Sequence, residues 1–422
     1  MSDLGLEAIR GLAPAVAGGL KRGADAAWPR AKVNTSAGMC SVLVHTSFES
    51  ARSPWLELEA QGHLTPYQSF DFLHAWYLAL GTHECTQPRI VEGRLPDGRL
   101  AFVWPFGICA WHGLPVLGWL GGKHANYNLG IYSPHALSAM APGDWRNLLR
   151  AATRLAGADA AVLLNQPERF ETLSNPLLET RSLASASDCY AARLEPDYEK
   201  LMERLRNRGS RKKIRRNIRR LEETAGPVSL QKATTLTQII ETLGALRAHK
   251  GQLDPSRPDR HIFADARVIG FLTTAARAVS QARAPAIEIY ALKAGANIVA
   301  TFGGAVSAKR AAGTFISIDA QDFGNCAPGE VLIAKLLEEF STRGIETFDL
   351  GVGEAEYKSR WCHEVETLFD TILPATARGR ILTAPVMHAA LRAKAAVKHS
   401  PWLLAIARKT GLQSAKGNLP AA

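Results

Sequence analysis

The sequence lacks the cysteine patterns that mark disulfide-stapled domains and zinc-binding folds. Its 422 residues contain six cysteines, and no two of them form a C-x-x-C pair. This distribution excludes a small disulfide scaffold and a zinc ribbon, and it fits a reducing compartment. The twelve histidines show no two-histidine metal spacing with a carboxylate on a helix face, so we expect no metal site.

Long apolar runs are also missing. No segment approaches the roughly 18 consecutive apolar residues that a membrane-spanning helix needs. The first 33 residues are rich in alanine and glycine but contain charged residues that interrupt any signal-peptide core. We therefore expect a flexible or weakly helical leader over residues 1–40. We also expect a cytoplasmic protein, one that can also lie peripherally at the inner membrane.

Three familiar catalytic or nucleotide-binding motifs are absent. There is no G-x-S-x-G elbow, so an α/β-hydrolase site lacks its usual anchor. The stretch Gly121-Gly122-Lys123 lacks the glycine spacing of a phosphate-binding loop, and His124 follows where that loop has Ser or Thr. The sequence around Gly351 lacks the third glycine of a dinucleotide fingerprint.

Positive charge is concentrated in two segments. Residues 198–223 contain eleven Lys/Arg and four Glu, and residues 376–422 contain eight Lys/Arg and no acidic residue. The net charge of the whole chain is +11, so the rest of the chain is slightly acidic. Such segments attract nucleic acid, anionic lipid or a polyphosphate cofactor, although a solvated helical face has the same composition.

The apolar positions in these two segments suggest their structure. In residues 198–223 the apolar face changes near Gly209, which predicts two helices with a break there. In residues 385–409 apolar residues alternate with basic ones, which is typical of a helix on an anionic membrane surface. A disordered basic tail is the alternative.

The order of predicted elements repeats along the chain. Strands, turns, a helix and a buried strand follow one another over residues 89–165, and the same order returns over residues 286–351, roughly 190 residues later. We predict an α/β (α+β) fold with two such units, each a mixed, mainly antiparallel sheet flanked by helices.

The length of the chain also favours two domains. We expect an N-terminal lobe over residues 41–190, a C-terminal domain over residues 191–375 and a basic tail over residues 376–422. Residues 249–262 contain two prolines and no periodicity, so we expect a long loop there, and long loops often carry function.

Two stretches of the second unit suggest a site. In residues 314–330 a strand leads through a Gly/Asn/Pro loop to a helix start, where free backbone N–H groups can bind phosphate oxygens. In residues 346–361 a strand that carries Asp349 runs into a loop with a carboxylate, a phenol and an ammonium group. These groups can accept a proton, donate a proton and hold an anion. An ordinary strand-to-helix turn and solvated side chains are the plainer interpretation of each stretch.

The same stretches resemble a known superfamily. The runs SRKKIRRNIRRLEE, LKAGANIVATFGG, APGEVLIAKLLEEF and FDLGVGEAEYKSRW resemble those of the CelD-like branch of the GNAT acyltransferases, which is linked to cellulose and other polysaccharide synthesis. The resemblance covers residues 190–370 well and residues 40–190 more weakly. That branch is also similar to the FemAB-type peptidyltransferases, which pair two GNAT-like lobes in one chain.

The resemblance implies transfer of an acyl group from acetyl-CoA or another acyl-CoA to an amine or hydroxyl. The usual Gln/Arg-x-x-Gly-x-Gly/Ala signature is present only in its first half, from Gln321 to Gly324. By position, the cofactor-binding residues would be Ile318, Gln321, Gly324, Asn325, Pro328 and Gly329, with Ile318 on the strand that aligns the thioester. The catalytic residues would be Asp349 or Glu354 as proton acceptor, Tyr357 as proton donor, and Lys358 holding a phosphate or the acceptor. His124, Asn126 and Tyr127 are candidates for acceptor binding between the lobes.

Three functions remain open on these grounds. The first is an acyl-CoA-dependent transferase acting on a small-molecule or glycan acceptor, such as a sugar, glycolipid or polysaccharide precursor. The second is FemAB-like transfer from aminoacyl-tRNA, with the basic helices on the tRNA phosphates. The third is a non-catalytic GNAT-like scaffold of a polysaccharide synthesis machine.

Overall fold

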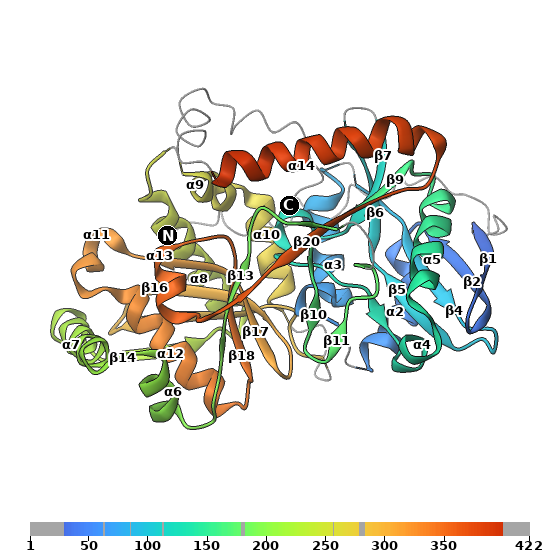
Figure 1. Ribbon diagram of the computed structural model, residues 1–422. Coiled ribbons are helices and arrows are strands. Elements are labelled where there is room, and N and C mark those ends of the chain that lie inside the picture. Colours follow the sequence, from blue (N-terminus) through green and yellow to red (C-terminus); the bar gives the residue numbers. More distant parts are fainter. Residues whose placement is uncertain are drawn as a thin grey trace.

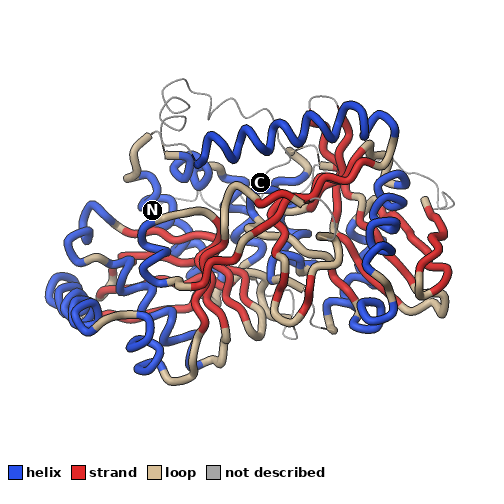
Figure 2. The backbone as a smooth tube through the Cα atoms, viewed as in Figure 1, coloured by secondary structure: helices blue, strands red, loops and turns tan. Residues whose placement is uncertain are grey.

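The computed structural model describes residues 29–61, 64–84, 86–111, 114–178, 182–255, 257–277 and 283–399. These residues form two α/β units whose sheets lie side by side, with helices on their faces (Figures 1 and 2). The sheets are mixed and mainly antiparallel, which confirms the predicted fold class. Residues 1–28 of the expected leader and residues 400–422 of the basic tail lie outside the described part of the chain.

The first unit is a sheet interrupted at Pro105. Its elements are β1 (Arg30–Thr35), β2 (Gly38–His45), α2 (Phe48–Glu59), η1 (Pro66–Gln68), α3 (Phe70–Trp76), η2 (Tyr77–Gly81), β3 (Gln87–Pro88), β4 (Ile90–Arg94), β5 (Leu100–Trp104), β6 (Phe106–Trp111), β7 (Leu114–Trp119), η3 (Gly122–His124), β8 (Ile131–Tyr132), α4 (Pro134–Ala139), α5 (Pro142–Leu155), β9 (Ala160–Pro167), β10 (Arg169–Phe170), β11 (Leu173–Ser174) and β12 (Leu183–Ala184). Strands β1-β2-β4-β5-β8 form one sheet, and β6, β7 and β9 belong to the next. Proline has no N–H for a strand ladder, so the break falls between β5 and β6.

The second unit is one continuous sheet. Its elements are β13 (Cys189–Arg193), α6 (Tyr198–Leu205), α7 (Arg208–Ala225), β14 (Val228–Lys232), α8 (Leu236–Gly251), α9 (Pro258–Ala264), α10 (Ala266–Ala275), β15 (Glu288–Ala294), β16 (Asn297–Val306), β17 (Arg310–Ile318), α11 (Ala320–Phe323), η4 (Gly324–Cys326), α12 (Pro328–Thr342), β18 (Thr347–Val352), α13 (Glu356–Trp361) and β19 (Glu364–Glu366). The strand order is β14-β15-β16-β17-β18-β13-β19. The chain then continues through β20 (Leu368–Pro374), η5 (Gly379–Thr383) and α14 (Ala384–His399).

The two units repeat one topology, as predicted. In the first, β7 and β9 are parallel and joined through α5; in the second, β17 and β18 are parallel and joined through α12. Both crossover helices begin with a Pro-Gly pair, Pro142-Gly143 and Pro328-Gly329. The apolar side chains along one face of α12 are buried against the sheet, as are most of those of α5.

A two-stranded ribbon joins the units. Residues 183–191 run antiparallel to residues 364–370, with Leu183 opposite Asp370 and Ala191 opposite Glu364. Within this ribbon β20 pairs with β9 of the first unit, whereas β13 pairs with β18 of the second. The first unit is therefore completed by β20, which follows the second unit in the sequence (Figure 1). Strand β20, which lies within the expected C-terminal domain of residues 191–375, thus pairs with the first unit.

The structure bears on three local expectations. The break in the basic segment falls between α6 and α7, at Asn207, which is two residues before Gly209. The Asn207 side chain caps α7 by accepting from the Ser210 N–H. The expected loop 249–262 is mostly helical, because α8 runs to Gly251 and α9 begins at Pro258, a favoured first helical residue. Strand β1 lies within the segment expected to be a flexible leader.

The beginning of the basic tail is ordered. Helix α14 packs against the first unit through Ala384, Met387 and Leu391, which contact apolar residues of β7, β9 and β20. Residues 384–399 are therefore helical, and the alternative of a disordered tail is wrong for them. Among the described residues, no helix is both long and apolar enough to cross a membrane.

Candidate functional site

The second unit has a gap between two parallel strands. Strands β17 and β18 pair only from Arg310 to Ala312 and from Thr347 to Asp349. Both strands then continue, to Ile318 and Val352, without pairing to each other. A cavity of about 240 Å³ lies there, between the gap and the loop that follows β7 in the first unit.

The wall of this cavity is basic. Three lysines and one histidine contribute to it, and no Asp or Glu is among its described lining residues. Such a wall favours a ligand that is anionic or rich in hydrogen-bond acceptors. In the described part of the chain, no three or more His, Cys, Asp and Glu side chains are grouped to hold a metal ion. The polar lining side chains are those of Lys123, His124, Asn126, Lys250, Thr314, Tyr357 and Lys358.

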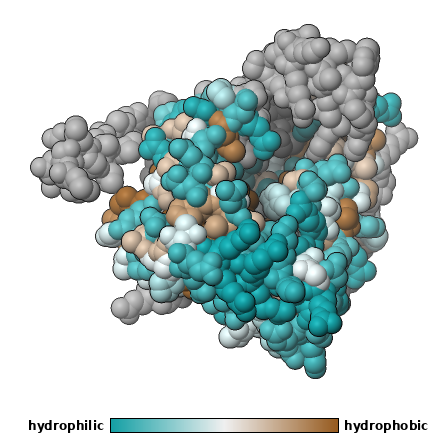
Figure 3. Space-filling view, turned by 90° about the vertical axis from the view of Figure 1, so that its left-hand side faces the viewer, coloured by the Kyte–Doolittle hydropathy of each residue, from teal (hydrophilic) through white to brown (hydrophobic). Residues whose placement is uncertain are grey.

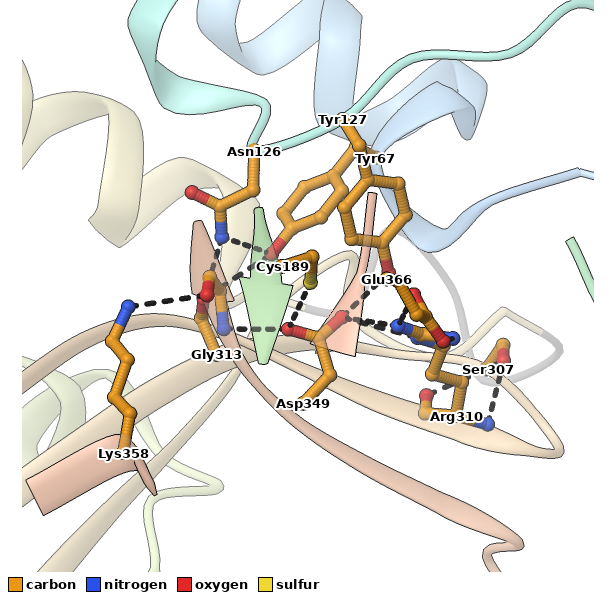
Figure 4. A network of polar contacts seen from close by, with 11 residues as sticks. Tyr67, Asn126, Tyr127, Cys189, Ser307, Arg310, Gly313, Asp349, Lys358 and Glu366 are labelled. Atoms are coloured by element: carbon orange, nitrogen blue, oxygen red, sulfur yellow. Dashed lines mark hydrogen bonds and ion pairs between the residues drawn. The ribbon is translucent and has the colours of Figure 1, made fainter. Parts of the chain in front are cut away.

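Helix α13 brings Tyr357 and Lys358 to the cavity. The Lys358 side chain is buried, and its Nζ donates to the carbonyl oxygens of Gly351 (3.1 Å) and Val352 (3.0 Å) (Figure 4). These carbonyls belong to the end of β18, beyond its pairing with β17. A fixed ammonium group at this position can stabilise negative charge that develops in the gap.

His124 is the imidazole of the cavity. Its side chain is buried, and its Nε2 has no hydrogen-bond partner within the described structure. Burial and, to a lesser extent, the neighbouring Lys123 lower its pKa to about 4. The ring is therefore neutral at pH 7 and can exchange a hydrogen bond with a bound ligand.

Asn126 occupies the base of the gap. Its Nδ2 donates to the Gly313 carbonyl (2.8 Å) and to the Tyr67 hydroxyl (2.7 Å), so a first-unit side chain satisfies a carbonyl of β17. Gly351 faces it with a φ of +78°, and a Cβ there would lie 2.6 Å from the Asn126 Nδ2. Glycine is therefore required at residue 351 on both conformational and steric grounds.

A buried ion pair lies directly beneath the gap (Figure 4). The Arg310 Nε donates to Asp349 Oδ2 at 3.0 Å, and its two terminal nitrogens donate to Glu366 of β19 at 3.0 and 2.7 Å. The Tyr127 hydroxyl donates to Asp349 at 2.8 Å, and burial raises the pKa of Tyr127 well above its usual value, so the hydroxyl keeps its proton. The remaining Asp349 oxygen accepts from the Gly351 N–H and the Cys189 thiol.

This network changes the roles expected for three residues. Asp349 is completely buried and both its oxygens have donors, so it is not placed to remove a proton from a ligand in the cavity. Tyr127 is buried with it and does not line the cavity. Glu354 is exposed and also lies outside the cavity wall. Of the expected catalytic and acceptor-binding residues, the structure brings together His124, Asn126, Tyr357 and Lys358.

The expected cofactor-binding residues form one continuous segment. Ile318 ends β17 and is 39% exposed, Gln321 lies in α11, and Gly324 and Asn325 lie in η4. Pro328 and Gly329 open α12, whose first turn has no side-chain cap. Pro328 has no N–H and the Glu330 N–H donates to the Ala327 carbonyl, so the Gly329 N–H is the group that this turn offers to an anion.

The Gln252 side chain fixes the beginning of this segment. Its Oε1 accepts from the N–H groups of Ala320 and Gln321, and its Nε2 donates to Asp319. The segment does not line the cavity; it begins at Ile318, two residues beyond Ile316, the last β17 residue of the cavity wall.

The equivalent gap of the first unit is closed. Strands β7 and β9 pair at Val116 and Leu117 and then separate, as β17 and β18 do. Asn128 fills the space: its N–H donates to the Asn165 carbonyl and its Nδ2 to the Leu164 carbonyl. The remaining cavity is about 30 Å³ and is lined in part by Trp76 and Trp119. Only the second unit therefore offers room for a ligand among these two gaps.

Sequence reasoning missed four residues of the site. Lys123 and Lys250 line the cavity, Gly313 supplies the carbonyl that Asn126 holds, and Arg310 neutralises Asp349. Arg310 has a signal in the sequence, because it is a charged residue at the start of the otherwise apolar run RAAGTFISI. Lys123 and Lys250 have none beyond their charge.

Replacing Arg310 should be far more costly than replacing an exposed arginine. Arg310→Met leaves the buried Asp349 without its cation, and we expect a loss of roughly 3–5 kcal/mol in the free energy of unfolding. Arg99→Met, which removes an exposed pair with Asp97, should leave the free energy of unfolding nearly unchanged, because exposed ion pairs contribute little. Urea unfolding of both variants checks this; equal losses would show that the buried pair is not the stronger constraint.

His124 should make the stability depend on pH. Its pKa is about 4 in the folded protein and about 6.5 in an unfolded chain, so the unfolded state binds more protons below pH 6.5. The wild-type protein should therefore lose about 3 kcal/mol relative to His124→Gln as the pH falls from 7 to 4. Denaturant titrations at several pH values measure the difference, which should stay constant between pH 7 and 8. A difference that is flat down to pH 4 would contradict the buried neutral imidazole.

Comparison with known proteins places the site in a recognised domain. Residues 208–359 match the family described as "Acetyltransferase (GNAT) domain". This range contains β17, β18, α12 and most of α13, and therefore both walls of the gap. No curated protein matches the sequence.

Several solved structures have a similar overall arrangement. FemX is 9% identical, with 76% of this chain and 98% of that chain covered and a TM-score of 0.49. The C-terminal domain of a putative lysylphosphatidylglycerol synthetase from Agrobacterium fabrum is 11% identical, with 80% and 95% covered and a TM-score of 0.45. A tandem GNAT protein from the clavulanic acid biosynthesis pathway is 11% identical, with 80% and 99% covered and a TM-score of 0.43. At these identities and TM-scores none of their activities transfers to this chain. Residues 208–359 match the GNAT acetyltransferase domain, and the match extends no further along the chain.

Proposed function

We propose that the protein transfers an acyl group from an acyl-CoA to an amine or hydroxyl of a small-molecule or glycan acceptor. The observation that carries this proposal is the gap between β17 and β18. It lies inside the segment that matches the GNAT acetyltransferase domain, and it opens into a basic cavity that its first-unit counterpart lacks.

The donor would lie along β17. Its diphosphate would bind at the first turn of α12, where the Gly329 N–H has no side-chain cap. From there β17 leads to the cavity, so a pantetheine arm along the strand would bring the thioester to the gap. The basic wall and the uncapped helix start both suit a ligand with this charge.

The side chains of the cavity can carry out the transfer. The acceptor's nitrogen or oxygen attacks the thioester carbonyl, and the Lys358 ammonium group stabilises the oxyanion that forms. His124 accepts the proton that the attacking atom loses, and a weak base suffices because an amine that has attacked a carbonyl is strongly acidic. Tyr357 donates a proton to the sulfur as the carbon–sulfur bond breaks. His124 thereby takes the role that the sequence suggested for Asp349 or Glu354.

The acceptor would enter from the side of the first unit. Lys123, His124 and Asn126 come from that unit, and Lys250 comes from α8 of the second. Amide, imidazole and ammonium groups suit a sugar, glycolipid or polysaccharide precursor, which is the acceptor class of the CelD-like branch that the sequence resembles. We therefore include membership of the CelD-like branch, and an acceptor of this class, in the proposed function.

A matched pair of glycine variants tests donor binding. Gly329 and Gly143 occupy the same place in α12 and α5, the second residue of each crossover helix. Gly329→Val adds a side chain where its Cβ lies 3.2 Å from Ile318 Cγ2, and it blocks close approach of a diphosphate. We expect acetyl-CoA affinity to fall at least tenfold in calorimetric titration.

Gly143→Val is the control, because nothing lies within 4 Å of a Cβ at that residue. It should leave acetyl-CoA binding unchanged. Equal binding by both variants would reject the α12 site, and no acyl-CoA binding by the wild-type protein would favour a scaffold. Melting temperatures of both variants separate a binding defect from unfolding.

A second candidate function is transfer from aminoacyl-tRNA. The observation that favours it is the outer face of α7, whose exposed cations have no ion pair within the described residues. Helix α7 packs against α12 and η4, so this face adjoins the expected donor site. Figure 3 shows that this side of the molecule is mainly hydrophilic. The exposed cations are Arg208, Lys212, Lys213, Arg215, Arg216, Arg219 and Arg220.

Salt dependence distinguishes the two donors. If α7 binds tRNA phosphates, log Kd should vary steeply with log salt, because each contact releases counterions. The variant Lys213→Gln/Arg216→Gln/Arg220→Gln should make this slope shallower by the amount that about two or three phosphate contacts contribute. Arg169→Gln/Arg277→Gln, two exposed arginines outside α7, should not change it. Fluorescence anisotropy with labelled aminoacyl-tRNA measures the salt dependence of binding for both variants. Weak binding by the wild-type protein, with the same slope in the α7 variant, would reject the tRNA donor.

A further inference from the structure

The segment η5–α14 has two apolar faces. One face packs on the first unit through Ala384, Met387 and Leu391. The opposite face is uncovered: Ile381 is 79% exposed, Leu382 47% and Val386 39%. A surface helix normally has a polar outer face, so the packing of α14 on the sheet does not account for these side chains.

The exposed apolar residues continue as a stripe along the helix. Pro385, Ala389, Ala393 and Ala396 are exposed and follow Ile381 at helical spacing. Helix α14 lies along the outside of the molecule, where its outer face is directed away from both sheets (Figure 1). At 16 residues it is about 24 Å long, since each residue adds about 1.5 Å.

The charge beside this stripe has one sign. Asp370 is the last acidic residue of the sequence. Arg380 and Arg392 are exposed next to the apolar stripe, whereas Arg378 pairs with Asp159. Burial lowers the pKa of Lys394, which lies beside Asp370 and is directed toward the first unit. The outer face therefore combines exposed apolar side chains with unopposed arginines.

We propose that η5–α14 binds the surface of an anionic lipid bilayer, with the apolar stripe in the interface and the arginines at the lipid phosphates. Helices that lie in a bilayer surface have this combination of an apolar face, basic residues and few acids. A second copy of the chain is a poorer occupant, because a symmetric contact through this face would bring Arg380 and Arg392 of both copies together. The proposal does not depend on the transferase function, since none of these residues lines the cavity.

Vesicle co-sedimentation of the full chain tests the proposal. The protein should bind vesicles of phosphatidylcholine with 30% phosphatidylglycerol at least tenfold more tightly than vesicles of phosphatidylcholine alone. Ile381→Gln/Val386→Gln should weaken binding to the anionic vesicles at least tenfold, while glutamine keeps a good helix propensity. Arg380→Gln/Arg392→Gln should remove most of the preference for phosphatidylglycerol.

Met39→Gln is the matched control, because Met39 is 50% exposed but lies on β2, away from α14. It should bind the anionic vesicles as the wild-type protein does. Far-UV circular dichroism confirms that each variant keeps its helices. Binding that is equal for both vesicle types, or equal for the wild-type protein and Ile381→Gln/Val386→Gln, overturns the proposal. So does self-association of the wild-type protein that the Ile381→Gln/Val386→Gln variant abolishes.

Discussion

The pairing of Arg310 with Asp349 is the interaction on which the rest of the structure depends. These residues lie where β17 and β18 are still paired, just before the two strands separate. Arg310 also binds Glu366 of the connecting ribbon, and Asp349 accepts from Tyr127 of the first unit. One buried pair therefore joins two strands, the ribbon and the other unit. Both charges are largely removed from water, so each is tolerated only because the other is present.

The gap above this pair differs between two units of the same topology. In the first unit Asn128 and tryptophan side chains fill the space between the separating strands. In the second unit Asn126 occupies only the base, and Lys358 holds the freed carbonyls from one side. In this duplicated fold, side chains fill the gap of the first unit, whereas the gap of the second unit is a cavity. The first unit contributes to that cavity through its loop, with Lys123 and His124.

Much of the fold could be predicted from the sequence, because local signals mark its elements. The repeat of strands and crossover helices, the Pro-Gly helix start at Pro328 and the break near Asn207 follow from periodicity and turn residues. The pairing of β20 with β9 of the first unit could not be predicted, since pairing between residues about 200 positions apart leaves no local pattern. The helix within residues 249–262 was missed because its Pro258 stands at a helix start and not in a loop.

The site was predictable only in part for the same reason. Tyr357 and Lys358 follow β18 closely in the sequence, and Lys358 binds carbonyls at the end of that strand. His124 lies in a polar loop. The burial of Asp349 depends on Arg310, 39 residues earlier, and no local feature of the strand shows that this carboxylate is neutralised. We therefore expected Asp349, a carboxylate at a strand end, to act as a base. In the structure both its oxygens already accept hydrogen bonds from the protein.

A crystal structure with coenzyme A would show whether the gap between β17 and β18, and not its counterpart in the first unit, receives the donor. We expect electron density for the pantetheine arm along β17, with the diphosphate at the first turn of α12 and the thiol near Lys358. Density between β7 and β9, or coenzyme A bound outside the second unit, would contradict this expectation.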